Sequence, residues 1–213
     1  YELCRTVENE LQLPTRFDKF EPETLITGDV FPCINESILK QLFAEISDHV
    51  VKVDLIRKVC ENRRTAGWYK RFLNYFDCLF FIGKMQTFYQ EHGGGFHIVE
   101  PKKIWNLYTS DLYRMDAYYR HFHYAFGNSL KNANDILEDG LKHSTEFVEA
   151  LYQNWFLREI TACWTNAAAD NLATLGYVSE IEKQRDFYKR YVASASSKNT
   201  RAFVIISDAL RYE

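Results

Sequence analysis

The chain contains the stretch Arg201-Ala-Phe-Val-Ile-Ile-Ser-Asp-Ala-Leu-Arg-Tyr-Glu213. Residues 203–206 are aromatic or β-branched, a pattern typical of a short strand in a parallel sheet whose two faces are both covered. Asp208 would stand at the carboxyl end of this strand, where open α/β sheets bind ligands. Residues 209–213 predict the first turn of a helix. The expected order is therefore strand, acid, helix.

Asp208 is the candidate functional residue of this stretch. A carboxylate held at a strand end is a hard oxygen ligand for a divalent metal ion, and a neighbouring loop can supply a nucleophile. An Asp before a helix is also an ordinary N-cap, which stabilises a helix by about 1 kcal/mol. A third alternative is a phosphoaspartyl nucleophile. It is less favoured, because such proteins carry further acids near the strand end and Ala209-Leu210 offers none.

Residues 203–213 closely resemble the opening of the PglZ domain, a branch of the alkaline phosphatase superfamily found in the BREX type of bacterial phage-resistance system. Other segments resemble the helical region that precedes the phosphatase domain in the type A proteins. They are Ile104-Trp-Asn-Leu-Tyr108, Asp116-Ala-Tyr-Tyr-Arg120, Leu151-Tyr-Gln-Asn-Trp-Phe-Leu157 and Gln184-Arg-Asp-Phe-Tyr188. The resemblance covers most of the chain, although only the final segment is a sharp motif.

The resemblance implies a chemistry for Asp208. In the superfamily the acid that ends the first strand is a metal ligand, so Asp208 is expected to bind a divalent metal, with zinc as the expected ion. The nucleophilic Ser or Thr and the remaining Asp and His ligands follow the first strand, so no catalytic residue is expected before Glu213. The chain begins with Tyr1 rather than Met, and we expect an internal fragment of a longer protein. The implied reaction is metal-dependent hydrolysis of a phosphate ester, such as a nucleic-acid phosphodiester, and the implied partners are other BREX defence proteins.

Composition indicates a helical globular protein. Hydrophobic residues make up 46% of the 213 residues and aromatic residues 16%, with only 9 Gly and 4 Pro. A formal net charge of −3 argues against a uniformly basic nucleic-acid binder. No run approaches the roughly 18 apolar residues of a membrane span, so no membrane contact is expected. The scattered cysteines predict reduced thiols and a cytoplasmic location.

Apolar periodicity predicts a mainly α fold, a bundle of about seven helices over residues 1–193. Residues 1–34 are punctuated by prolines and are expected to be irregular, apart from a short helix near residues 3–11. In residues 35–50, apolar residues repeat with the spacing of one buried helix face. Further helices are expected over residues 54–62, 68–91, 101–126, 134–138, 141–166 and 179–193. Residues 194–200 are small and polar and predict a linker. Residues 201–213 would then be the first strand and helix start of a truncated alkaline-phosphatase-like domain.

Basic residues gather in residues 52–71, with Trp68 and Tyr69 among them. Basic side chains bind phosphates and exposed aromatic rings stack on bases, which makes part of this region a candidate for DNA contact. The competing interpretation is a solvated face of two helices with the aromatic rings in the core. The candidate residues are Arg63, Arg64, Lys70 and Arg71.

Two further motifs are weak. His121 and His123 point about 200° apart on a helix, so they cannot share one metal ion. Gly93, Gly94 and Gly95 follow a helix and precede no Lys-Ser or Lys-Thr, and therefore predict a flexible helix exit rather than a phosphate loop.

Two functional hypotheses remain. In the first, the chain belongs to a metal-dependent phosphohydrolase and its helical part is a scaffold that docks partners. In the second, residues 1–193 form a non-catalytic module that binds protein or nucleic acid. A strand without its sheet presents an unpaired edge, so a homo-oligomer is also an open alternative.

Overall fold

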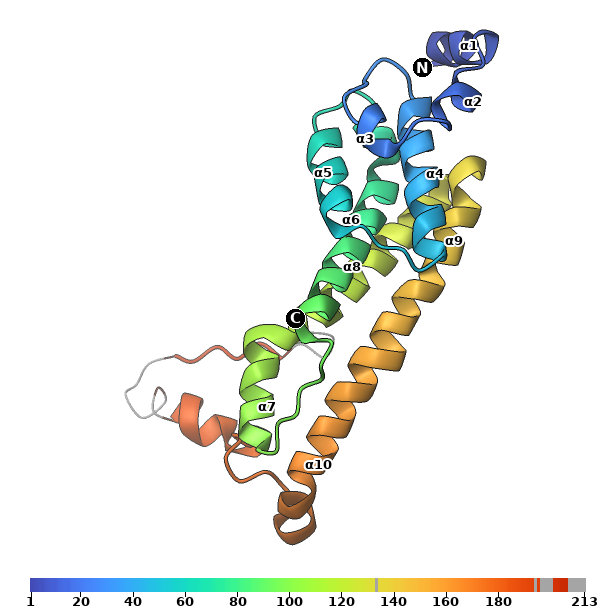
Figure 1. The fold of residues 1–213 in the computed structure, drawn as a ribbon. Helices are drawn as coiled ribbons and strands as arrows, with labels where there is room; N and C mark the ends of the chain where they lie inside the picture. The colour runs from blue at the N-terminus through green and yellow to red at the C-terminus, as the bar shows by residue number, and fades with distance from the viewer. Residues whose placement is uncertain (133, 194, 196–200, 207–213) are drawn as a thin grey trace. The chain divides into compact units, whose positions relative to one another are not determined.

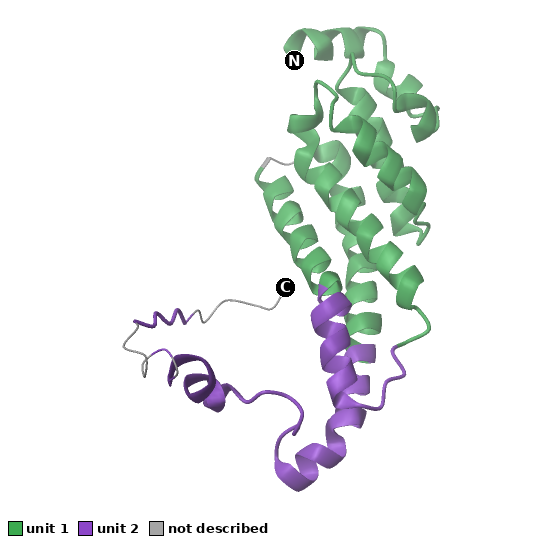
Figure 2. Cartoon of the chain, turned by 90° about the vertical axis from the view of Figure 1, so that its left-hand side faces the viewer, with its two compact units in different colours: residues 1–95, 114–158 green, residues 96–113, 159–213 purple. Residues whose placement is uncertain are grey.

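The computed structural model describes residues 1–132, 134–193, 195 and 201–206, and these residues are mainly helical, as predicted (Figure 1). The chain divides into two compact units. Unit 1 consists of residues 1–95 and 114–158, and unit 2 of residues 96–113 and 159–213 (Figure 2).

The first part of unit 1 is more regular than its prolines suggested. It forms α1 (Glu2–Glu10), α2 (Leu13–Phe17) and α3 (Pro22–Leu25). Pro14 and Pro22 lie in the first turns of α2 and α3, where a fixed φ suits the helix and the missing N–H costs no hydrogen bond. The prolines therefore start these helices. Both α2 and α3 pack against α4 (Cys33–Ser47).

The core of unit 1 is a bundle of long helices. Its members are α4, α5 (Val53–Arg63), α6 (Tyr69–His92), α8 (Tyr113–Ser129), α9 (Asp135–Glu149) and the π-helix η3 (Ala150–Leu157). Figure 1 shows α4 beside α9 and α5 beside α6, and α6 also contacts α4 and α9. The predicted inward face of α4 is confirmed, because Leu39, Leu42, Phe43 and Ile46 are fully buried. The helix predicted over residues 68–91 is α6, and its many buried residues place it in the core of unit 1.

Close packing explains one disagreement about helix bounds. Separate helices are predicted over residues 134–138 and 141–166, whereas α9 runs without a break through Gly140 to Glu149. A Cβ atom at Gly140 would lie 3.3 Å from Cβ of Phe43 in α4. Gly140 therefore allows α4 and α9 to approach each other, and packing outweighs its low helix propensity.

Unit 2 is smaller and has few buried side chains. It contains α7 (Pro101–Leu107), the π-helix η1 (Tyr108–Leu112), most of α10 (Arg158–Leu175), the 3-10 helix η4 (Gln184–Asp186) and the π-helix η5 (Tyr188–Val192). Its buried hydrophobic residues are Phe96, Ile104, Leu112, Ala168 and Val178. No helix in the described ranges is long and apolar enough to span a membrane.

The single helix expected over residues 179–193 is replaced by a turn and two short helices, η4 and η5. A capping box would join Glu182 to the Ser179 N–H. Instead the Glu182 carboxylate pairs with Arg190 and accepts a hydrogen bond from the Tyr191 hydroxyl at 2.8 Å. Because Glu182 binds Arg190 and Tyr191, it does not cap a helix at Ser179, and the helix predicted to begin there does not form.

The strand predicted over residues 203–206 is not observed. These residues have no regular structure, and Phe203 and Ile205 are 88% and 93% exposed. A strand needs a neighbouring strand to pair its backbone N–H and C=O groups. No strand is present in the part of the chain that the structure describes. The predicted linker, except Ala195, and the helix start at residues 209–213 lie outside the described residues.

Candidate functional site

Arg63, one of the candidate DNA-contacting residues, lies in the interior of unit 1. Its side chain is 1% exposed, and its Nε–H group donates to Oδ1 of Asn35 at 2.9 Å. The guanidinium also donates to the backbone carbonyls of Ile26, at 3.2 Å, and Gly28. Asp29 lies 3.9 Å away as an ionic partner. Burial lowers the pKa of this guanidinium and Asp29 opposes the shift, but an arginine stays charged. The structure therefore removes Arg63 from the surface set.

The other three candidate residues are exposed but do not form one group. Arg64 follows α5, and its guanidinium lies 5.4 Å from the ring centroid of Phe80. Lys70 and Arg71 lie in the first turn of α6 and line a pocket of about 300 Å³, which we call the α6 pocket. The structure thus brings Lys70 and Arg71 together and separates Arg64 from this pocket.

The α6 pocket is lined by polar side chains from several elements. Its lining consists of Lys70, Arg71, Phe72, Asn74, Tyr75, Ser129 and Asn134. Ser129 ends α8 and Asn134 is the N-cap of α9, where its side chain accepts a hydrogen bond from the Ile136 N–H at 3.0 Å. Among the described residues, the lining contains two cations and no carboxylate, although the Asn134 side chain donates a hydrogen bond to the Glu36 carboxylate at 2.8 Å.

The Tyr75 hydroxyl is a buried hydrogen-bonding group of the α6 pocket. The residue is 4% exposed, and its oxygen accepts a hydrogen bond from the Asn134 backbone N–H at 2.8 Å. Burial raises the pKa of Tyr75, the bond from Asn134 opposes the shift, and the negative charges of Glu138 and Asp135 add to it. The hydroxyl therefore keeps its proton at neutral pH, and that proton has no acceptor within the described ranges.

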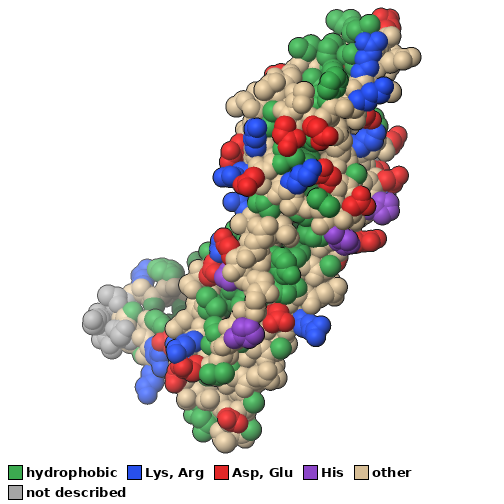
Figure 3. All heavy atoms as spheres, viewed as in Figure 1, with side chains coloured by type: hydrophobic (Ala, Val, Ile, Leu, Met, Phe, Trp, Pro, Cys, Tyr) green, Lys and Arg blue, Asp and Glu red, His purple; other side chains and the backbone are tan. Residues whose placement is uncertain are grey.

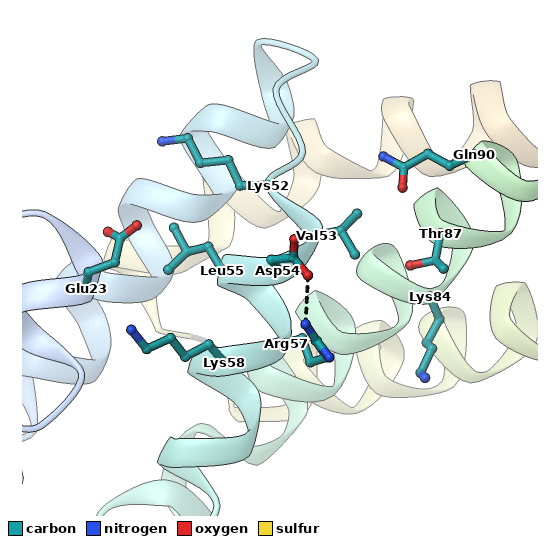
Figure 4. Close-up of a pocket in the computed structure, with 10 residues that line it drawn as sticks. All are labelled: Glu23, Lys52, Val53, Asp54, Leu55, Arg57, Lys58, Lys84, Thr87 and Gln90. Atoms are coloured by element: carbon teal, nitrogen blue, oxygen red, sulfur yellow. Dashed lines mark hydrogen bonds and ion pairs between the residues drawn. The ribbon is translucent and has the colours of Figure 1, made fainter.

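A second and wider hollow, of about 800 Å³, lies over α5 and α6 (Figure 4). It also holds basic residues, but acids neutralise part of their charge. Lys52 pairs with Glu45 at 2.6 Å and Arg57 pairs with Asp54 at 2.8 Å. On the face of the molecule shown in Figure 3, basic and acidic side chains are likewise interspersed over unit 1. The α6 pocket differs from this hollow because none of the described residues that line it is an acid.

Asp208, the predicted metal ligand, lies outside the described residues. Within the described ranges, no group of three or more His, Cys, Asp or Glu side chains is arranged to hold a metal ion. His121 stacks on Phe81 at a centroid distance of 5.0 Å, whereas Nε2 of His123 lies 3.0 Å from the Glu149 carboxylate. The two imidazoles therefore have separate partners.

Lys70 and Arg71 were candidates from their charge, whereas their neighbours in the pocket were not predicted. Ser129 and Asn134 lie about sixty residues further along the chain, and Asn134 is joined to Tyr75 across a separation of 59 positions. An N-cap pattern at Asn134 was visible in the sequence. Nothing local to either segment indicates that they share a pocket.

Comparison with curated proteins finds two relatives along the whole chain. The chain is 30% identical over 220 residues to an alkaline phosphatase-like protein PglZ from Bacillus cereus (strain H3081.97), a match that covers 100% of this chain and 24% of the relative. It is 28% identical over 215 residues to an alkaline phosphatase-like protein BrxZ from Escherichia coli O9:H4 (strain HS), covering 97% of this chain and 24% of that relative. The predicted resemblance to the PglZ family is confirmed.

The resemblance to PglZ proteins covers this chain but only part of each relative. The chain spans about a quarter of the length of each curated relative that it matches. No family model matches the chain, and no solved structure matches it. The similarity to PglZ proteins therefore rests on these sequence matches, and the helical fold described above corresponds to that quarter.

Proposed function

We propose that this chain is the helical part of a metal-dependent phosphohydrolase or phosphodiesterase that acts in BREX-type bacterial defence against phage. The observation that carries the proposal is the match, over the whole chain, to two alkaline phosphatase-like proteins. The resemblance of residues 203–213 to the opening of the PglZ phosphatase domain supports it. The expected substrate is a phosphate ester, with nucleic-acid phosphodiesters as the first class to test.

The proposed role of the helical units is to position the phosphatase domain and to dock other BREX proteins in the cytoplasm. Unit 1 supports this role through its continuous core, in which α4, α6 and α9 bury large aliphatic and aromatic side chains. A rigid scaffold of this kind can hold a site on a neighbouring domain in a fixed geometry. The absence of a metal-binding cluster from the described residues is compatible with chemistry supplied elsewhere.

In this proposal Asp208 is one ligand of a divalent metal ion, for which zinc is the first candidate. A carboxylate suits such an ion as a hard oxygen donor. A bound metal would orient the phosphate group and lower the pKa of the attacking group. The groups described in this chain supply no complete ligand set, so the nucleophile and the remaining ligands are expected from the phosphatase domain.

The experiment replaces Asp208 by Ala in a full-length protein that contains this segment. Asp170→Ala is the matched control, since Asp170 is an exposed acid on α10. We expect Asp208→Ala to abolish metal-dependent hydrolysis of a phosphodiester substrate and to leave assembly with BREX partners intact, whereas the control changes neither. Full hydrolytic activity in Asp208→Ala would refute the ligand assignment. A wild-type protein that assembles with partners but hydrolyses no phosphate ester would favour a non-catalytic module.

A further inference from the structure

We propose that the α6 pocket binds a phosphate group. This inference is independent of the proposed function, because it concerns residues of unit 1 and does not involve Asp208. The charge, the hydrogen-bond donors and the size of the pocket all favour a phosphate group.

The charge of the pocket comes from Lys70 and Arg71. Neither side chain has a carboxylate within ion-pair distance in the described part of the chain. The Arg71 guanidinium instead lies 3.7 Å from the ring centroid of Tyr1, a cation–π contact that holds it in place and leaves its N–H groups available. Two cations without a counter-charge repel each other, and an anion bound between them would relieve that repulsion.

The place of these cations on α6 strengthens the argument. The first turn of α6 contains no acid, and its N-cap residue, Trp68, makes no side-chain capping bond. The N-terminus of a helix carries a partial positive charge, so Lys70 and Arg71 are unfavourably placed there in the absence of an anion. A phosphate group in the pocket would interact favourably with both side chains and with the helix end.

Neutral donors complete the pocket. Within the described residues, the Tyr75 hydroxyl proton has no acceptor and the Asn74 side chain makes no hydrogen bond. Phosphate oxygens accept several hydrogen bonds from such groups, and charge-assisted bonds from Lys and Arg are about twice as strong as neutral ones. The volume of about 300 Å³ accommodates a phosphate group with its nearest waters and excludes a folded partner.

The phosphate could come from two sources that share this chemistry. One is free inorganic phosphate, and the other is a backbone phosphate of single-stranded DNA that lies across the exposed rim formed by Lys70 and Arg71. Free phosphate would bind with a weak dependence on salt. A DNA strand would contact several cations, so its affinity would fall steeply as salt increases.

The test titrates inorganic phosphate, and separately a single-stranded DNA 12-mer without terminal phosphates, into the 213-residue chain while amide resonances are followed by NMR. The variant Lys70→Gln/Arg71→Gln removes both pocket cations. The control, Lys58→Gln/Lys84→Gln, removes the same charge from two lysines of the wider hollow over α5 and α6 (Figure 4). Circular dichroism melting verifies that both variants are folded.

We expect the pocket variant to weaken binding by more than about tenfold and the control to change it by less than about twofold. If inorganic phosphate saturates the pocket and the 12-mer does not bind, the ligand is free phosphate. Binding of the 12-mer only, lost in the pocket variant, would identify a DNA backbone phosphate. If neither probe binds, or if the pocket variant and the control bind alike, the proposal is refuted.

Discussion

The Nε–H group of Arg63 donates a hydrogen bond to Oδ1 of Asn35 at 2.9 Å, and both side chains are buried in unit 1. This bond joins α5 to α4. The same guanidinium donates to the carbonyls of Ile26 and Gly28, which lie after α3 in a segment without regular structure. One side chain thus satisfies acceptors that no helix could satisfy.

Arg63→Met should lower the free energy of unfolding by about 2–4 kcal/mol, because Asn35 and the two carbonyls would lose their shared donor while they stay buried. Lys58→Met, also on α5, is the control. Lys58 is exposed, and we expect its replacement to change stability by less than about 0.5 kcal/mol. Urea denaturation followed by circular dichroism measures both values. An equal effect of the two substitutions would show that Arg63 is not a structural arginine.

Gly83→Ala should be destabilising by about 1–3 kcal/mol, because the new methyl group would lie 2.9 Å from Cγ2 of Ile56 and force α5 away from α6. Gly127→Ala on α8 is the matched change. Nothing lies within 4 Å of a Cβ atom there, so we expect it to stabilise the helix by about 0.5–1 kcal/mol. Thermal unfolding of the two variants should therefore shift in opposite directions. A shift in the same direction would contradict the close approach of the two helices at Gly83.

Asp77 gives a pH-dependent prediction. Burial raises the pKa of its carboxyl group, and Arg64 and His121 oppose the shift. An acid whose folded pKa is raised is most favourable below its unfolded pKa, and its contribution to stability falls as pH rises through the folded pKa. The variant Asp77→Asn does not titrate at this position, so its stability relative to the wild type should increase from about pH 3 to about pH 7. Urea midpoints across this pH range provide the measurement, and a difference that stays constant or shrinks would disprove the assignment.

The cysteines should differ in reactivity although all five carry free thiols. Burial raises the pKa of Cys60 to about 12 and also raises the pKa values of Cys33 and Cys78. At pH 8 these three thiols are protonated and inaccessible, so a thiol reagent should modify them more than about 100-fold more slowly than Cys4 and Cys163. Peptide mapping by mass spectrometry after timed labelling identifies the modified positions. Rapid labelling of Cys60 in the folded protein would show that the α5–α6 interface opens readily.

The helical fold was largely predictable because helix formation depends on local spacing. The inward face of α4 and the aromatic content of α6 could be read directly from residues three and four positions apart. The prediction failed where a local signal competed with packing. Glycine is common at helix ends, yet Gly140 lies inside α9 because a small residue fits against Phe43.

The candidate site was predictable only in part. Lys70 and Arg71 were chosen as candidates from their charge. The α6 pocket that they line also requires Ser129 and Asn134, which the folding of α8 and α9 brings close to α6. Arg63 carries the same charge in the same stretch of sequence and was placed in the same set. Its burial depends on Asn35 and on carbonyl groups about thirty positions earlier, which local sequence does not reveal.

The amino-acid sequence by itself determined that this protein is mainly helical, which faces of its long helices are apolar, and that it resembles PglZ proteins. These properties follow from residue spacing and from short motifs, which need no knowledge of distant contacts. The tertiary structure alone decided which basic residues are structural and which line a pocket. Burial and hydrogen-bond partners are set by segments far apart in the chain, and identical side chains therefore acquire different roles.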